Sequence, residues 1–225
     1  MKNAILCLLK VSSKSLLILL ILATVGCRQR LAENHYKQAV VLSQLGQYEE
    51  AVAEFDSAIE FAPEYVDAWQ GKADAYLSLE KYEQAYQAYD QTARLDPKRT
   101  DAGFGMALCL ENMDNYEEAI AVYDKVLERR PKDPNSWFGK GNCFKGLRKY
   151  DDALKAYNKV IEFSPEAAGA WYNQAWIYAQ KKEKTNVLAD LAKAISLDGD
   201  YKEQAKADEA FQWLREDAEF KKLTD

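Results

Sequence analysis

The sequence predicts an all-α fold, an α-solenoid of five helical hairpins followed by a C-terminal capping helix. Four prolines recur at a fixed interval of 34 residues, at Pro63, Pro97, Pro131 and Pro165, and one further interval reaches Gly199. The segments YEEAVAEFDSAIEFAPE (48–64) and YEEAIAVYDKVLERRPK (116–132) repeat the same order of residue types 68 residues apart. Only ten Gly and five Pro occur in 225 residues, which favours helix over strand. A fixed period of this size indicates stacked helical repeats.

Residues 1–27 form the first element and have the layout of a secretory signal. A basic start precedes twelve mostly apolar residues, Ser15 to Gly26, and Cys27 follows. This apolar run is shorter than the about 20 residues that span a bilayer, but it fits the hydrophobic region of a signal peptide. Extending it upstream would bury Lys10 and Lys14, each at about 2.5–3.5 kcal/mol near the bilayer centre. We therefore expect a signal peptide rather than a spanning helix.

The residues before Cys27 make this expectation more specific. The segment ATVGC resembles a bacterial lipobox, in which small residues lead to a cysteine that is lipidated before cleavage. Val25 and Gly26 match that pattern, whereas Thr24 stands where the family usually has Leu. The resemblance implies lipid attachment at Cys27 and an exported protein, anchored to a bacterial membrane and facing the periplasm or the exterior. An ordinary cleaved signal, or membrane attachment through an uncleaved N-terminal segment, is the alternative.

The repeats are defined by columns of similar residues. Counting from residue 32, after a short linker at 28–31, gives five repeats: 32–65, 66–99, 100–133, 134–167 and 168–201. The eighth and twentieth positions are small in almost every repeat, and the eleventh and twenty-fourth are large. Small columns let the two helices of a hairpin approach closely, and large columns fill the space between hairpins. Each recurring proline should end the second helix of its repeat, because it lacks an amide donor and disfavours α geometry in the preceding residue.

Two segments show the repeat most clearly, WQGKADAYLSLEKYEQAYQAYDQTARLDP (69–97) and WFGKGNCFKGLRKYDDALKAYNKVIEFSP (137–165). They resemble the tetratricopeptide repeat (TPR) family, and the resemblance covers about three quarters of the chain. It departs from the family pattern at His35 and Gly103, where Trp is preferred, and at Lys184 and Val187 in the fifth repeat. Membership of this family implies binding of protein or peptide partners.

The tail, residues 202–225, is expected to cap the last hairpin. Four of its residues follow the i, i+3, i+4, i+7 spacing of a helix with one apolar face: Ala207, Ala210, Phe211 and Leu214. This segment resembles the solvating helix that closes many TPR arrays. Trp213 lies off the stripe and is expected to be partly exposed.

Residue types that carry catalysis are scarce. His35 is the one histidine of the sequence, and a packing or surface role is favoured for it. We find no glycine-rich phosphate loop, no cysteine pair at metal-ligand spacing and no nucleophile elbow. The residues after Cys27 hold 27 basic against 36 acidic side chains, a net charge of −9 that argues against nucleic acid. We therefore expect no enzyme activity, no cofactor, no metal and no small-molecule substrate.

Two further cysteines, Cys109 and Cys143, occupy the tenth position of their repeats, where other repeats have small apolar residues. Equivalent positions in neighbouring hairpins should lie about 8–10 Å apart, as packed helices do. A disulfide requires Cα atoms within about 7 Å of each other. The spacing therefore predicts two buried free thiols.

In TPR arrays the first helices of successive repeats line a concave groove, to which positions two, five, nine and twelve contribute. Carried over to this sequence, the partner-binding groove consists of Tyr36, Phe104, Leu108, Phe138, Asn142, Lys145, Tyr172 and Trp176. The resemblance implies that partner segments stack on the aromatic rings, that Asn142 bonds to the partner backbone, and that Lys145 attracts an acid. The dicarboxylate clamp of some family members needs Lys and Arg where the third repeat has Asp101 and Gly105, so that activity is not expected.

These observations predict a non-enzymatic scaffold that is tethered to a membrane through its N-terminal lipid and binds protein or peptide segments in its groove. Envelope assembly or complex biogenesis is the setting that this combination implies. The alternative is a structural homo-oligomer that assembles through the groove or the capping helix. The sequence leaves the oligomeric state, the partner and the choice of inner or outer membrane open.

Overall fold

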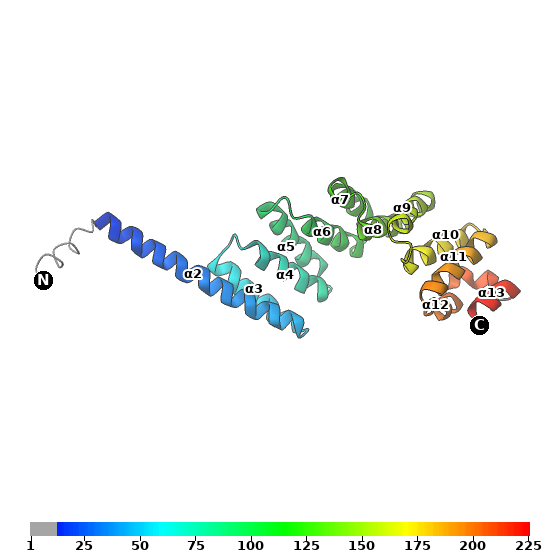
Figure 1. The fold of residues 1–225 in the computed structure, drawn as a ribbon, viewed down its shortest axis with the longest axis horizontal. Coiled ribbons are helices and arrows are strands. Elements are labelled where there is room, and N and C mark those ends of the chain that lie inside the picture. The colour runs from blue at the N-terminus through cyan, green and yellow to red at the C-terminus, as the bar shows by residue number, and fades with distance from the viewer. Residues whose placement is uncertain (1–12) are drawn as a thin grey trace, which may run out of the picture. The chain divides into compact units, whose positions relative to one another are not determined.

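The computed structural model describes residues 13–225, with side chains from residue 26 onward, and every regular element in this part of the chain is a helix (Figure 1). The described residues form two compact units, one ending at Lys98 and one comprising Arg99–Asp225. The predicted signal peptide, residues 1–27, lies partly outside the described residues. The predicted linker, residues 28–31, is helical instead, because helix α2 (Ser13–Gln44) runs through it without a break.

The first unit contains two helical hairpins. Helix α2 pairs with α3 (Tyr48–Phe61), and α4 (Val66–Ser78) pairs with α5 (Tyr82–Leu95). Its core holds the small residues that the columns predict, among them Ala39 and Ala51, around the ring of Phe55, which is 1% exposed.

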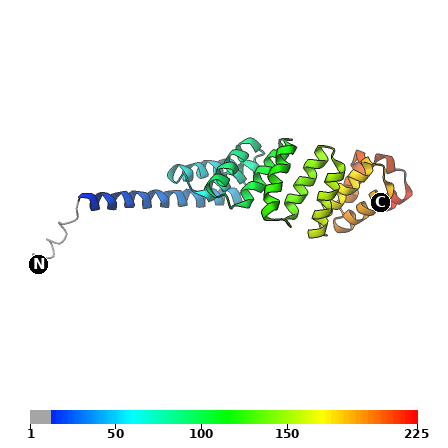
Figure 2. The same ribbon diagram turned by 90° about the horizontal axis from the view of Figure 1, so that it is seen from above.

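The second unit contains three hairpins and the tail. The hairpins pair α6 (Thr100–Asn112) with α7 (Tyr116–Arg129), α8 (Pro134–Gly146) with α9 (Tyr150–Phe163), and α10 (Ala168–Gln180) with α11 (Lys184–Leu197). Figure 2 shows these helices side by side, coloured from green to orange. Within residues 13–225, the predicted all-α fold of five helical hairpins is thus confirmed.

The four recurring prolines follow the second helices of the first four repeats, as the sequence predicts, whereas α11 in the fifth repeat ends at Leu197, ahead of Gly199. Helix α3 stops at Phe61, and Ala62, directly before Pro63, has φ −138° and ψ 86°, outside the helical region. Ser164, before Pro165, has φ −144° and ψ 79°. The pre-proline residue is driven toward extended geometry by its clash with the proline ring, which frees the chain to begin the next hairpin.

The turn inside each hairpin uses one residue in the left-handed region. It falls at the same repeat position each time: Gly46 (φ 75°), Glu80 (57°), Asp114 (60°), Arg148 (55°) and Lys182 (61°). Only the first hairpin supplies glycine, which adopts this conformation without steric cost. The other four hairpins hold a side chain there, so the turn geometry is imposed by the packing of the two helices rather than by turn chemistry.

Within each unit, successive hairpins are joined by a polar contact from the seventh repeat position to the twenty-fifth position of the preceding repeat. In the first unit Lys72 Nζ lies 2.6 Å from Asp56 Oδ1. In the second unit Lys140 pairs with Asp124, and Gln174 Nε2 donates to Asn158 Oδ1 at 2.9 Å. The contact is an ion pair in two cases and a neutral hydrogen bond in the third, so what recurs at these positions is a pair of matched hydrogen-bonding groups rather than a charge.

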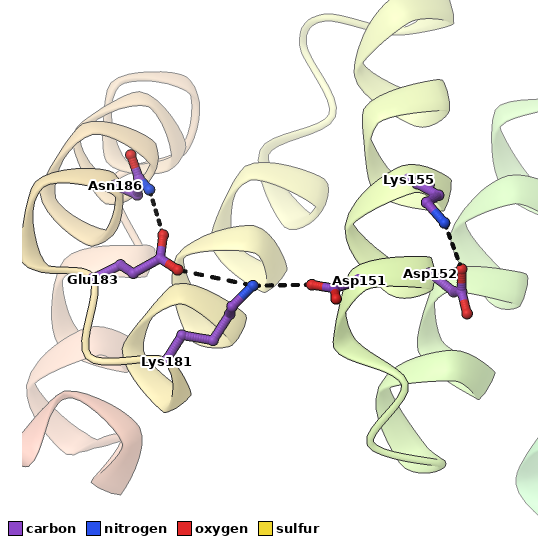
Figure 3. Close-up of polar contacts among 6 residues, drawn as sticks. All are labelled: Asp151, Asp152, Lys155, Lys181, Glu183 and Asn186. Carbon is purple, nitrogen blue, oxygen red and sulfur yellow. Dashed lines mark hydrogen bonds and ion pairs between the residues drawn. The ribbon is translucent and has the colours of Figure 1, made fainter.

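A second link between hairpins lies at the surface of the second unit. Lys181 Nζ is 2.9 Å from Asp151 Oδ1 and 3.8 Å from Glu183 Oε1, and so connects the end of α10 to the start of α9 (Figure 3). Asp151 is 80% exposed. Exposed ion pairs of this kind contribute little to stability, because solvent screens them and the side chains lose entropy.

The tail caps the last hairpin as three short segments: α12 (Tyr201–Ala207), the 3₁₀ helix η2 (Glu209–Leu214) and α13 (Ala218–Thr224). Asp208 and Asp217 start the second and third segments by accepting backbone N–H groups, which interrupts a single helix. Phe211, Leu214 and Phe220 are buried against α10 and α11. Ala207 of the predicted stripe is exposed, because the helix ends there.

Trp213 is 36% exposed, as predicted, and the Lys182 ammonium lies 4.8 Å from its ring centroid.

Candidate functional site

The first helices of the three hairpins in the second unit bring aromatic and polar side chains together. We define the α6–α8–α10 face by eight partly exposed residues: Phe104, Leu108 and Glu111 on α6, Phe138, Asn142 and Lys145 on α8, and Asn173 and Trp176 on α10. Six of them were predicted from the repeat positions. Tyr36, also predicted, lies in the first unit, where its ring tilts against Phe55 and Tyr65.

Buried tyrosines support the aromatic part of this face. The rings of Phe104 and Tyr123 lie 6.0 Å apart, and those of Phe138 and Tyr157 lie 5.6 Å apart, both in tilted geometry. Tyr123 and Tyr157 have no exposed surface. Each tyrosine belongs to the second helix of the hairpin whose first helix carries the phenylalanine. Its buried ring therefore supports the phenylalanine ring in one orientation.

The same tyrosines hold the polar part of the face from beneath. Tyr123 donates its hydroxyl to Glu111 Oε2 at 2.7 Å, and Tyr157 donates to Asn142 Oδ1 at 2.8 Å. Burial, and then the charge of Glu111, raise the pKa of both tyrosines. Their hydroxyls therefore remain protonated donors.

From these anchors a chain of hydrogen bonds crosses the three helices. Asn142 Nδ2 donates to Glu111 Oε1 at 3.0 Å, and Asn173 Nδ2 donates to Asn142 Oδ1 at 3.4 Å. Lys145 Nζ donates to Asn173 Oδ1 at 2.8 Å. A connected network of this kind fixes the side chains before any partner arrives.

Two charged groups sit at the ends of this chain. Burial raises the pKa of the Glu111 carboxyl, against the hydrogen bonds from Tyr123 and Asn142 and the charge of Lys145. Burial lowers the pKa of Lys145, against the charges of Asp208 and Glu111. The Lys145 ammonium also lies 5.5 Å from the ring centroid of Trp176.

The structure corrects the placement of Tyr172. We expected its ring in the open groove, but it is 4% exposed. Its hydroxyl donates to Asp208 Oδ2 at 2.9 Å, and its ring lies 4.8 Å from that of Tyr201 and 5.7 Å from that of Phe211. The tail covers this end of the face, so Tyr172 belongs to the core.

The prediction for Asn142 also changes in detail. Its carbonyl oxygen accepts from Tyr157 and Asn173, and its amide nitrogen donates to Glu111. One N–H of the side-chain amide is left for a partner. Glu111 occupies the twelfth repeat position, as Lys145 does one repeat later, so the repeat pattern could have identified it as a groove residue. Asn173 is at the sixth position, which is not one of the groove positions, so the sequence did not point to it.

The histidine and the cysteines of the described chain lie outside the α6–α8–α10 face. His35 Nδ1 lies 2.6 Å from Glu54 Oε2, and its ring stacks on Phe61 at 5.6 Å, which fits the packing role that the sequence favours. Cys109 and Cys143 are buried thiols that take part in no disulfide, as predicted. Cys27 is exposed on α2. In the part of the chain that the structure describes, no helix has both the length and the apolar character of a membrane span.

Comparison with known proteins agrees with this architecture. Four family models, each described as a tetratricopeptide repeat, match residues 36–100, 77–138, 134–166 and 168–201. No curated protein matches the chain.

Solved structures show the same fold. YrrB, described as a TPR protein with an unusual peptide-binding site, is 26% identical, with 74% of this chain and 86% of YrrB covered and a TM-score of 0.62. MamA from Desulfovibrio magneticus RS-1, residues 41 to the end, is 17% identical, with 79% and 97% covered and a TM-score of 0.70. Another crystal structure of MamA is 16% identical, with 75% and 96% covered and a TM-score of 0.67. The family matches and the repeated hairpins agree, and the chain belongs to the tetratricopeptide repeat family.

Proposed function

We propose that the protein is a non-enzymatic scaffold that binds an extended segment of a partner protein on the α6–α8–α10 face. The observation that supports this most is the fixed chain of polar groups beside partly exposed rings, held by Tyr123 and Tyr157. Side chains that are already ordered lose little entropy on binding, and rings of this kind are frequent anchors of interfaces. The likeness to YrrB, a TPR protein with a peptide-binding site, supports the same function.

The first test removes the aromatic anchors. Peptides are selected from a random nonapeptide phage library on the full-length protein, purified in a mild detergent, and their affinities are measured by fluorescence anisotropy. Changing both Phe138 and Trp176 to Ala should weaken the selected peptides at least tenfold, about 1.4 kcal/mol, because apolar contact area is lost. Phe163→Ala is the matched control, since Phe163 is a partly buried ring on the second helix of the same hairpin.

Circular dichroism of each variant confirms that helical content is retained. Equal affinity for wild-type protein and the double variant would exclude the face as the binding site. A dimer that withstands dilution in light scattering, with no peptide selected, would instead favour the homo-oligomer.

We also propose that Cys27 carries a lipid that tethers this scaffold to a bacterial membrane, with the TPR units in the periplasm or exterior. The lipobox-like segment ATVGC supports this, as does the exposure of Cys27. One acyl chain gives marginal membrane binding and two or more give stable anchoring. Such a tether would hold the face close to envelope proteins, which fits a role in envelope assembly or complex biogenesis.

Metabolic labelling with an alkyne-bearing fatty acid in a bacterial host tests the tether. Label should enter the wild-type protein and the control Cys7→Ala, and should be lost in Cys27→Ala. An unlabelled wild-type protein that remains in the membrane fraction would favour an uncleaved N-terminal segment instead.

A further inference from the structure

We propose that Lys145 selects partner segments that present a glutamate or aspartate side chain, whose carboxylate completes an ion pair on the α6–α8–α10 face. This inference rests on the proposed function of the same face and names the chemistry of its ligand. The argument starts from the surroundings of the ammonium group.

Lys145 is partly buried and incompletely bonded. Its ammonium has three N–H donors, and one of them donates to Asn173 Oδ1 at 2.8 Å. Among the described residues it forms no ion pair. A buried charge without a paired counter-charge is costly, so a carboxylate that reaches it gains more than one that meets an exposed lysine.

The acids nearest to it are already bonded to other donors. Glu111 accepts from Tyr123 at one oxygen and from Asn142 at the other. Asp208 accepts from the Tyr172 hydroxyl and from the backbone N–H of Ala210. Both carboxylates favour the charged form of Lys145 through space. Their oxygens are engaged in hydrogen bonds to Tyr123, Asn142, Tyr172 and Ala210 instead.

A second lysine on the same helix shows the complete arrangement. The Lys140 ammonium lies 5.2 Å from the ring centroid of Trp137 and also pairs with Asp124. Lys145 has the matching ring, with Trp176 at 5.5 Å, but no acid of the described chain takes the place of Asp124. The comparison identifies the missing group as a carboxylate.

The position of the ammonium favours a side chain over a chain terminus. Lys145 is only partly exposed, and its ammonium lies against Asn173 and the Trp176 ring, both on α10. A side chain that projects from an extended backbone can reach this ammonium while the backbone passes over Phe138 and Trp176. We therefore expect an acid flanked by apolar residues, not a free C-terminal carboxylate.

The peptides selected on full-length protein test this directly. Aligned sequences should share a Glu or Asp at one position, and replacing that residue by Gln or Asn should weaken binding to wild-type protein about tenfold. Lys145→Met should bind the acidic and the amide peptide equally, because the ion pair is gone. Lys155→Met is the matched control, since Lys155 lies exposed on α9 and pairs with Asp152, and it should discriminate as wild-type does.

The possible results separate this inference from the function on which it rests. If no peptide binds better to wild-type protein than to the Phe138 and Trp176 double variant, the proposed function fails. If peptides bind there but tolerate the amide, or Lys145→Met still discriminates, the function stands and this inference is wrong. Binding that is lost when the peptide C-terminus is amidated would also overturn it. If Lys145→Met has a lower melting temperature than wild-type protein, Lys145→Gln replaces it in these measurements, because the Gln side chain keeps a hydrogen-bond donor toward Asn173.

Discussion

Leucine in place of Ala119 lowers the free energy of unfolding by about 1–3 kcal/mol, the usual cost of overpacking a close contact. Ala119 lies on α7 with no exposed surface, in the small column that allows α6 and α7 to approach. The added carbons have no free space to enter and must separate the two helices. Urea titration followed by circular dichroism measures the loss as a lower midpoint with an unchanged slope.

Ala121→Leu on the same helix is the control. Ala121 is exposed, and leucine is nearly as good a helix former as alanine, so its midpoint should stay close to that of the wild-type protein. Equal midpoints for the two variants would show that the twentieth position does not lie at a helix contact.

Asparagine in place of Asp190 should stabilise the protein at pH 7 and flatten its dependence on pH. One carboxylate oxygen of Asp190, on α11, is buried without a hydrogen-bond partner, and burial raises its pKa to about 6. The folded state therefore binds the carboxyl proton of Asp190 more tightly than the unfolded state does. The stabilisation that comes from this protonated carboxyl is complete below about pH 4 and is lost as pH rises through about 6. Since the group is not fully buried, we expect a gain of about 1–2 kcal/mol at pH 7.

Asp151→Asn is the control with the opposite sign. Lys181 lowers the pKa of Asp151, by hydrogen bond and by charge (Figure 3), and the carboxylate is exposed. Removing it should not stabilise the protein at any pH. Thermal unfolding between pH 4 and 8 measures the stability of both variants. If the stability of wild-type protein and of Asp190→Asn changed with pH in parallel, the raised pKa of Asp190 would be contradicted.

The helices could be predicted because their determinants are local and periodic. Proline ends the second helix in each of the first four repeats through its own ring and missing donor, and this effect does not depend on distant residues. The small columns predicted Ala119 and Ala51 as buried, and both are. The burial of Cys109 and Cys143 followed from the tenth position in the same way, because a position repeated in each hairpin has repeated surroundings.

The tail and its effect on the face could not be predicted in this way, because neither repeats. Asp208 caps η2 and also accepts a hydrogen bond from the Tyr172 hydroxyl. This hydrogen bond joins residues 36 positions apart, and among the described residues no other repeat has an equivalent of it. The interior position of Tyr172 follows from this single contact and the rings around it. Asn173 was missed for a related reason, since its role depends on Asn142 and Lys145 on a neighbouring helix.

The most direct test of the proposed binding face is to locate a bound peptide on the protein. A selected peptide with a photoreactive benzophenone beside its acidic residue is irradiated with full-length protein, and the linked residues are identified by mass spectrometry. We predict links to first-helix residues such as Leu108 and Trp176, which are weaker in Lys145→Met at the same peptide concentration. Links confined to exposed residues of α7 and α9, such as Ala121 and Lys155, would contradict binding on the α6–α8–α10 face.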